Sequence, residues 1–116
     1  MQLSKARKAK HAKLSADHTT VSSTGGYRSV QSNKGVRVGT WYFEIEVIHL
    51  GETGHSRLGI GTERQEIDGP CGYNENSYGF RDVDGSKVHK GWREPYSEGY
   101  REGDVVGCGL TLLPTT

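Results

Sequence analysis

The sequence predicts an all-β protein, an antiparallel sandwich of short strands joined by tight turns. Glycine contributes 17 of the 116 residues, about twice its usual share of ~7%, and a glycine inside a helix costs about 1 kcal/mol. Residues 40–48 alternate between apolar and polar side chains, which is typical of a half-buried strand. After residue 18, no segment shows the period of an amphipathic helix. Short strands with regular turn signals indicate a sandwich or a barrel.

The first 18 residues differ in composition from the rest of the chain. They combine alanines with a series of basic residues, which are Lys5, Arg7, Lys8, Lys10 and Lys13. Alanine and lysine favour helix, but this segment has no apolar face with which a helix could dock. We therefore expect a disordered basic arm over residues 1–18, followed by the β domain over residues 19–116. The arm could be a solvated tail, a nuclear address or a weak nucleic-acid contact through these five basic residues.

Seven strands are expected in the remainder of the chain, at residues 19–22, 27–32, 40–48, 57–62, 77–82, 87–89 and 105–113. Residues 19–22 are rich in β-forming residues, and the second strand follows a Gly25-Gly26 turn. The clearest strand places its apolar side chains on one face, which are Trp41, Phe43, Ile45 and Val47. The Asp84-Gly85 turn predicts a hairpin, and Gly103-Asp104 opens the last strand.

The bulk composition narrows the class of protein. Hydrophobic residues make up 32% of the chain and the net charge is +1, so we expect a thin core and no general coat of nucleic acid or membrane. There is neither an apolar run of the ~20 residues that a spanning helix needs nor an apolar secretory segment. We expect Cys71 and Cys108 to be reduced thiols in a cytosolic or nuclear protein, although a disulfide between them stays open.

Motifs for catalysis, cofactors and metals are missing from the sequence. Gly59-Ile60-Gly61 begins like a dinucleotide fingerprint, but Arg64 breaks the pattern and no helix follows. There is no phosphate-loop lysine motif, no Gly-x-Ser-x-Gly elbow and no Cys-x-x-Cys, and the five histidines have no zinc-binding spacing. We therefore expect no enzyme, no cofactor and no metal, although a pair of glycosidase carboxylates stays open because nothing selects one.

The loop and strand between Asp68 and Asp82 form the candidate binding segment. The segment combines Pro70, several glycines, three aromatic residues and Arg81. Loops held on a β scaffold often carry binding residues, and tyrosine and arginine are common at binding hot spots. The alternative is a connecting loop whose tyrosines serve the core.

Four segments resemble, in order, the signature strands of SPRY (B30.2) domains. They are residues 39–47, 57–61, 77–81 and 102–107, and the resemblance covers residues 25–109. Finer features, including Gly26-Tyr27-Arg28-Ser29-Val30 and Pro70-x-Gly72-Tyr73, are similar to the SPRY domain of the trithorax-group Ash-two family, called Trauco in plants. The resemblance implies a SPRY-like antiparallel β-sandwich without catalytic activity. Because that family continues for another half-domain, we expect the sandwich to be incomplete and the chain to be truncated.

The resemblance also implies a function. SPRY domains of this family belong to nuclear Set-one/COMPASS-type complexes, which methylate lysine four of histone H-three. There the domain binds an acidic segment of the WD-repeat subunit and helps to activate the SET-domain methyltransferase. Two alternatives stay open. One is a generic SPRY recognition module of a ubiquitin ligase or RNA-processing protein, and the other is a nucleic-acid binder acting through the basic arm.

By resemblance, five residues match the lining of the acidic-peptide pocket: Tyr27, Arg57, Pro70, Tyr73 and Arg81. Guanidinium groups grip carboxylates bidentately, tyrosines form rigid walls, and proline keeps a loop preorganised. A lysine of the family, two positions after the second arginine, is replaced by Val83, and we expect lower affinity unless Lys87 compensates. The alternative is that both arginines only pair with nearby carboxylates, namely Asp68, Asp82 or Glu63.

Overall fold

The computed structural model describes residues 1–24, 28–50 and 55–114, and within these ranges the chain forms ten strands and no helix. The strands are β1 (Leu3–Lys8), β2 (Lys13–Leu14), β3 (Val21–Ser22), β4 (Val30–Ser32), β5 (Gly39–Glu46), β6 (Arg57–Gly61), β7 (Ser77–Arg81), β8 (Lys87–His89), β9 (Trp92–Glu94) and β10 (Val105–Leu112). Every strand pair is antiparallel, so the predicted all-β antiparallel class is confirmed. None of the described segments is a helix that could cross a membrane.

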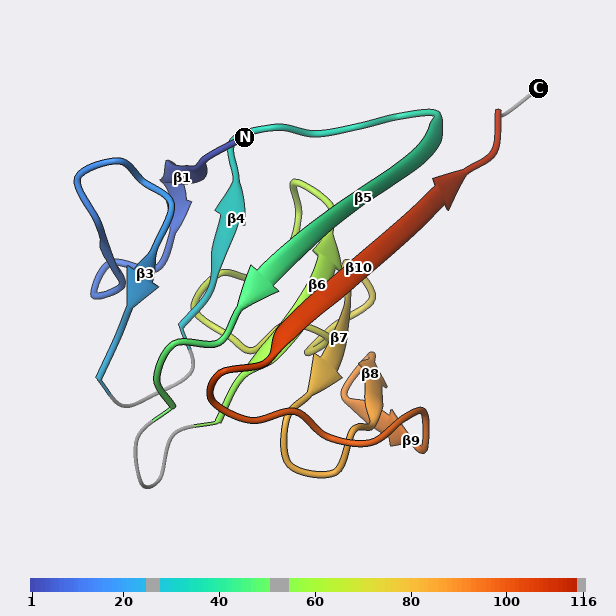
Figure 1. Cartoon of the computed structure of the whole chain (residues 1–116). Coiled ribbons are helices and arrows are strands. Elements are labelled where there is room, and N and C mark those ends of the chain that lie inside the picture. Colours follow the sequence, from blue (N-terminus) through green and yellow to red (C-terminus); the bar gives the residue numbers. More distant parts are fainter. Residues whose placement is uncertain (25–27, 51–54, 115–116) are drawn as a thin grey trace.

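The largest sheet has four strands in the order β6-β7-β8-β9 and carries the candidate binding segment (Figure 1). Its turns follow the sequence signals, since Gly85 has a φ of 66° and the amide of Arg81 donates to the carbonyl of Ser86 across 2.9 Å. The predicted hairpin between β7 and β8 is confirmed. Strand β9 was not expected from the sequence.

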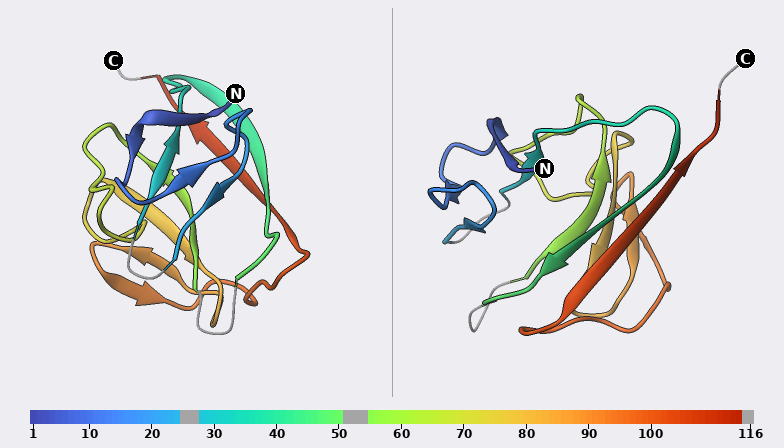
Figure 2. Two further views of the ribbon diagram at one scale, coloured as in Figure 1. Left: turned by 90° about the vertical axis from the view of Figure 1, so that its left-hand side faces the viewer. Right: turned by 45° about the horizontal axis from the view of Figure 1, so that its top comes forward.

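Strands β5 and β10 form a second, two-stranded sheet that pairs over eight residues of each strand. Figures 1 and 2 show it as a long ribbon that runs obliquely to the four-stranded sheet. The predicted alternation is confirmed from Phe43 to Val47, since Phe43 and Ile45 are half-buried, Val47 is buried, and Glu44 and Glu46 are exposed. Trp41, which was expected on the same apolar face, is exposed. The face that carries Phe43 is therefore the inward face of the ribbon.

We expect the chain to associate at micromolar concentration. Among the described residues, β10 has only β5 as a neighbour, and its sequence contains no charge or proline that would protect an edge. Trp41 at the start of β5 is 42% exposed and Leu113 after β10 is 78% exposed. Light scattering should therefore detect oligomers, and Thr111→Lys, which places a charge on this edge strand, should reduce them. A monomer at all concentrations would contradict this expectation.

The prediction of a disordered arm over residues 1–18 is wrong. Strand β1 pairs with β4, and β2 pairs with β3, so the basic segment is part of the β structure (Figures 1 and 2). Further bonds fix it, since the amide of Leu3 donates to the carbonyl of His18 across 2.7 Å and the Nη2 of Arg7 donates to the carbonyl of Gln65 across 2.9 Å. The segment therefore docks through its backbone and through small side chains, and neither route needs an apolar stripe.

The core is thin, as the composition predicts. Among the residues that the structure describes, the buried apolar side chains are Ala9, Ala12, Val47, Cys71, Val88 and Tyr100. Two of these six belong to the N-terminal segment, where Ala9 is 2% exposed and Ala12 is 3% exposed. Because alanine is small, its burial brings two backbones close together and adds little to a hydropathy pattern.

Candidate functional site

Two of the predicted site residues, Arg57 and Arg81, lie directly opposite each other on the neighbouring strands β6 and β7. Side chains of directly opposed residues in an antiparallel pair project to the same face of the sheet. Gly59 and Gly79 form the next cross-strand pair on this face. The two arginine side chains therefore project side by side from this face, and the neighbouring glycine pair leaves the sheet backbone uncovered by side chains.

The loop that carries Pro70 and Tyr73 packs on this face of the sheet, over Gly79. A Cβ on Gly79 would lie 3.1 Å from the carbonyl carbon of Cys71 and 3.5 Å from the Cβ of Arg57, so the loop backbone reaches the sheet beside Arg57. The glycine pair makes this approach possible, because any side chain there would meet the loop backbone. The β7 residues that face inward are consequently Ser77 and Gly79, and Tyr78 points outward.

The loop is held by hydrogen bonds at both ends of its turn. The amide of Tyr73 donates to the carbonyl of Pro70 across 3.0 Å, and the amide of Gly72 donates to the Oγ of Ser77 across 2.7 Å. Gly72 has a φ of +90°, a conformation that favours glycine. The side chain of Tyr73 is 59% exposed. An exposed tyrosine on a fixed turn is a rigid surface for a ligand.

Arg81 is oriented by the carboxylate of Asp84. Its Nη1 donates to Asp84 Oδ2 across 3.0 Å, while Asp84 Oδ1 accepts from the amide and the Oγ of Ser86 at 3.1 and 2.7 Å. The Ser86 hydroxyl and amide, with a smaller contribution from Arg81, lower the pKa of Asp84 to about 2. Asp84 is therefore ionised at neutral pH and fixes one edge of the guanidinium. The partners expected from sequence did not include Asp84; Asp82 instead has its Oδ2 3.5 Å from the Nδ1 of His55.

The charge of Arg57 also affects the pKa of Cys71. Burial raises the pKa of the Cys71 thiol to about 11, and the hydrogen bond with Ser77 and the positive charge of Arg57 act in the opposite direction. Both cysteines are free thiols, and burial also raises the pKa of Cys108. Arg57 thus interacts electrostatically with Cys71, which follows Pro70 in the loop.

Tyr27 lies outside the described residues, but its neighbour Ser29 joins β4 to the same loop. The Oγ of Ser29 donates to the carbonyl of Gly69 across 2.6 Å, and its amide donates to the carbonyl of Ile67 across 2.8 Å. The loop before Pro70 is therefore tied to the segment that follows Tyr27 in the chain.

The structure does not bring Lys87 to Arg81. Lys87 is the cross-strand partner of Phe80, so it projects to the opposite face of the sheet. Its Nζ lies 3.6 Å from the Oε2 of Glu94 on β9. Val83 is 57% exposed beside the turn. The compensation for Val83 that the sequence suggested is therefore not provided by Lys87.

Two features of this region were not expected from the sequence. One is the ion pair between Arg81 and Asp84, which the spacing of three residues between them could have suggested. The other is a row of aromatic rings on the outer face, where Tyr78 and His89 stack with centroids 3.8 Å apart and Trp92, opposite His89, is 76% exposed. In the part of the chain that the structure describes, no group of three or more histidines, cysteines or carboxylates could hold a metal ion.

Residues 40–112, which include the ribbon, both arginines and the loop on the sheet, match the SPRY domain family. The chain belongs to the SPRY domain family. This SPRY domain is similar to the Set1 complex component ash2 of Schizosaccharomyces pombe, with 34% identity over 100 residues, 83% of this chain and 15% of that protein. It is also similar to the Set1/Ash2 histone methyltransferase complex subunit ASH2 of Drosophila melanogaster, with 33% identity over 117 residues, 94% of this chain and 21% of that protein.

Another relative is not named as a subunit of such a complex. Ran-binding protein 9 of Xenopus laevis is 31% identical over 107 residues, 91% of this chain and 18% of that protein. The chain thus spans between 15% and 21% of the length of the three relatives described.

Proposed function

We propose that this SPRY domain is a non-catalytic interaction module that binds an acidic peptide segment of a partner protein. The observation that carries the proposal is the cross-strand pair of Arg57 and Arg81 on the face covered by the Pro70 loop. Two guanidinium groups side by side can grip the carboxylates of one peptide bidentately, which lysines could not copy. The proposed site comprises Tyr27, Arg57, Pro70, Tyr73 and Arg81.

The bonds around the site support a preorganised pocket. Asp84 holds one edge of Arg81 in place, so less side-chain freedom is lost when a carboxylate binds the other donors. The side chain of Arg81 is 22% exposed, and partial burial strengthens an ion pair relative to a fully exposed one. The turn from Pro70 to Tyr73 is closed by its own hydrogen bond, which fixes the tyrosine wall.

The biological setting that we propose is a Set1/COMPASS-type histone methyltransferase complex in the nucleus. Two of the relatives described above are named as subunits of such complexes. The acidic segment would belong to the WD-repeat subunit of the complex, and the module would act on the SET-domain methyltransferase indirectly. The similarity to Ran-binding protein 9 favours a second candidate, a SPRY recognition module of another assembly, in which the same pocket would bind a different acidic peptide.

The first test measures peptide binding. The variants Arg81→Ala and Arg57→Lys are each titrated by calorimetry with a Glu/Asp-rich peptide from the WD-repeat partner. Each should weaken binding by about 1–3 kcal/mol, the usual range for the loss of a charge-assisted hydrogen bond. The lysine variant keeps the positive charge and removes only the planar guanidinium group. A loss of affinity in this variant therefore indicates that the arginine binds the carboxylate bidentately.

Arg37→Ala is the matched control, because Arg37 is an exposed arginine outside the proposed site. It should bind the peptide like the parent protein, and all variants should keep the far-ultraviolet dichroism of the parent. Unchanged affinity in both site variants, or an equal loss in Arg37→Ala, would rule out the proposed pocket. Binding of acidic peptides other than that of the WD-repeat partner with equal affinity would favour the second candidate.

A further inference from the structure

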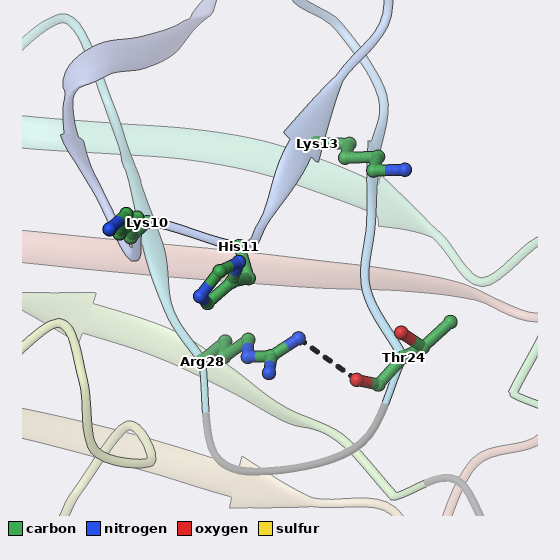
Figure 3. A pocket seen from close by; sticks show the side chains of 5 residues that line it. All are labelled: Lys10, His11, Lys13, Thr24 and Arg28. Atoms are coloured by element: carbon green, nitrogen blue, oxygen red, sulfur yellow. Dashed lines mark hydrogen bonds between the residues drawn. The ribbon is translucent and has the colours of Figure 1, made fainter.

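We propose that a basic hollow at the N-terminal side of the molecule binds the phosphate backbone of a nucleic acid. The hollow has a volume of about 380 Å³ and is lined by Lys10, His11, Lys13, Thr24 and Arg28 (Figure 3). None of these residues belongs to the proposed peptide site, and the ligand proposed here is of a second class.

The described residues that line the hollow carry positive charge and no carboxylate. Lys10, Lys13 and Arg28 are permanently charged at neutral pH, and none of them has an acidic side chain within 4.0 Å among the described residues. Lys10 and Lys13 are both exposed. Three uncompensated cations around one hollow make a local positive potential that attracts anions.

Arg28 is held in position by the chain around the hollow. Its Nη1 donates to the carbonyl of Thr24 across 2.9 Å and to the Oγ of Ser23 across 3.3 Å, and Figure 3 shows the first of these bonds across the hollow. The guanidinium and His11 both line the hollow. An arginine fixed by one nitrogen keeps its other N–H donors in a defined geometry for an anion.

Two other basic residues of the N-terminal segment, Arg7 and Lys8, have structural partners. Lys8 donates through its Nζ to the carbonyl of Ala12 across 2.8 Å, which closes the turn that carries Lys10 and His11. Arg7 donates through its Nε to the Oε1 of Gln31 across 3.0 Å and through its Nη2 to the carbonyl of Gln65. Of the five basic residues that were expected to contact a nucleic acid, Lys10 and Lys13 line the hollow, where Arg28 joins them, whereas Lys5 lies outside it on β1.

The chemistry of the hollow favours phosphate over peptide. Among the described residues, the hollow is lined by no aliphatic side chain and by no phenylalanine, tyrosine or tryptophan, whereas peptide recognition depends on buried apolar and aromatic anchors. Contacts to nucleic-acid phosphates come from lysine, arginine and threonine side chains and need no apolar wall. Such binding is driven by the release of counterions, so it depends steeply on salt concentration.

The test is a salt titration with a short fluorescent DNA duplex of mixed sequence. The double variant Lys10→Gln/Lys13→Gln and the single variant Arg28→Gln are compared with the parent chain between about 50 and 200 mM salt. Each phosphate contact contributes about 0.9 to the slope of log affinity against log salt concentration. The double variant should therefore lower the magnitude of the slope by roughly 2, and the single variant by roughly 1.

Arg93→Gln is the charge-matched control, because Arg93 is exposed on β9, on the far side of the molecule from the hollow (Figure 1). Its slope should equal that of the parent. An equal decrease in Arg93→Gln would show diffuse attraction, and an unchanged slope in the hollow variants, or no binding by the parent, would overturn the proposal. All of these results are independent of Arg57 and Arg81, so each site can fail alone.

Discussion

Replacing Gly72 with alanine is expected to destabilise the protein strongly. Gly72 has a φ of +90°, and a Cβ there would collide with the carbonyl oxygen of Val88 and lie 2.9 Å from the Val88 Cβ. Val88 is 1% exposed, so it has no free space into which it could move. Left-handed strain of about 1–2 kcal/mol and overpacking of about 1–3 kcal/mol act together. Urea denaturation should therefore show a free energy of unfolding lower by roughly 2–5 kcal/mol, or no folded protein at all.

Gly35→Ala is the control for the same chemical change. A Cβ on Gly35 would meet no atom within 4 Å, and its φ is not in the left-handed region. Its free energy of unfolding should stay the same or rise by up to about 1 kcal/mol, because alanine restricts the unfolded chain. If Gly72→Ala folds, its displaced loop should also weaken binding of the acidic peptide, whereas Gly35→Ala should not. Equal stability of the two variants would show that the loop does not pack on the sheet as described.

The parts of the fold that could be predicted from sequence are those in which local signals agree. The alternation around Phe43 and the Asp84-Gly85 turn each predicted their elements, because side-chain period and turn chemistry act over a few residues. All seven expected strands have a counterpart within a few residues of the expected bounds. Tertiary contacts did not override these local preferences.

The inward face of β7 could not be predicted in the same way. Alternation alone would place Tyr78 and Phe80 inside, but the structure buries Ser77 and Gly79 beneath the loop. The reason is that loop backbone packs on the sheet at a distance that only small residues allow. Phe80 is covered from its own side by the rings of Tyr96 and Tyr100, with centroids 5.8 and 5.2 Å away.

The relative positions of the candidate site residues are only partly contained in the sequence. The register of β6 and β7 brings Arg57 and Arg81 together, as the resemblance implied. The same kind of register separates Lys87 from Arg81, because a residue paired with Phe80 must face the other way. The face of the sheet on which a side chain lies relative to a residue of another strand depends on the register between the strands. The composition or spacing within one strand does not contain that information.

A substitution in the N-terminal segment is also expected to lower the free energy of unfolding strongly. Ala9 is 2% exposed and its amide donates to the carbonyl of Ser29 across 2.8 Å, whereas its neighbour Lys10 is exposed. Ala9→Gln should lower the free energy of unfolding by about 2–4 kcal/mol, because a longer polar side chain overpacks the site and buries an amide without partners. Lys10→Gln introduces the same side chain one position later and should change stability by no more than about 0.5 kcal/mol. Urea denaturation of the two variants decides between the docked segment and a flexible arm. In a flexible arm both substitutions would leave the transition unchanged, and that result would contradict the packing of β1 described above.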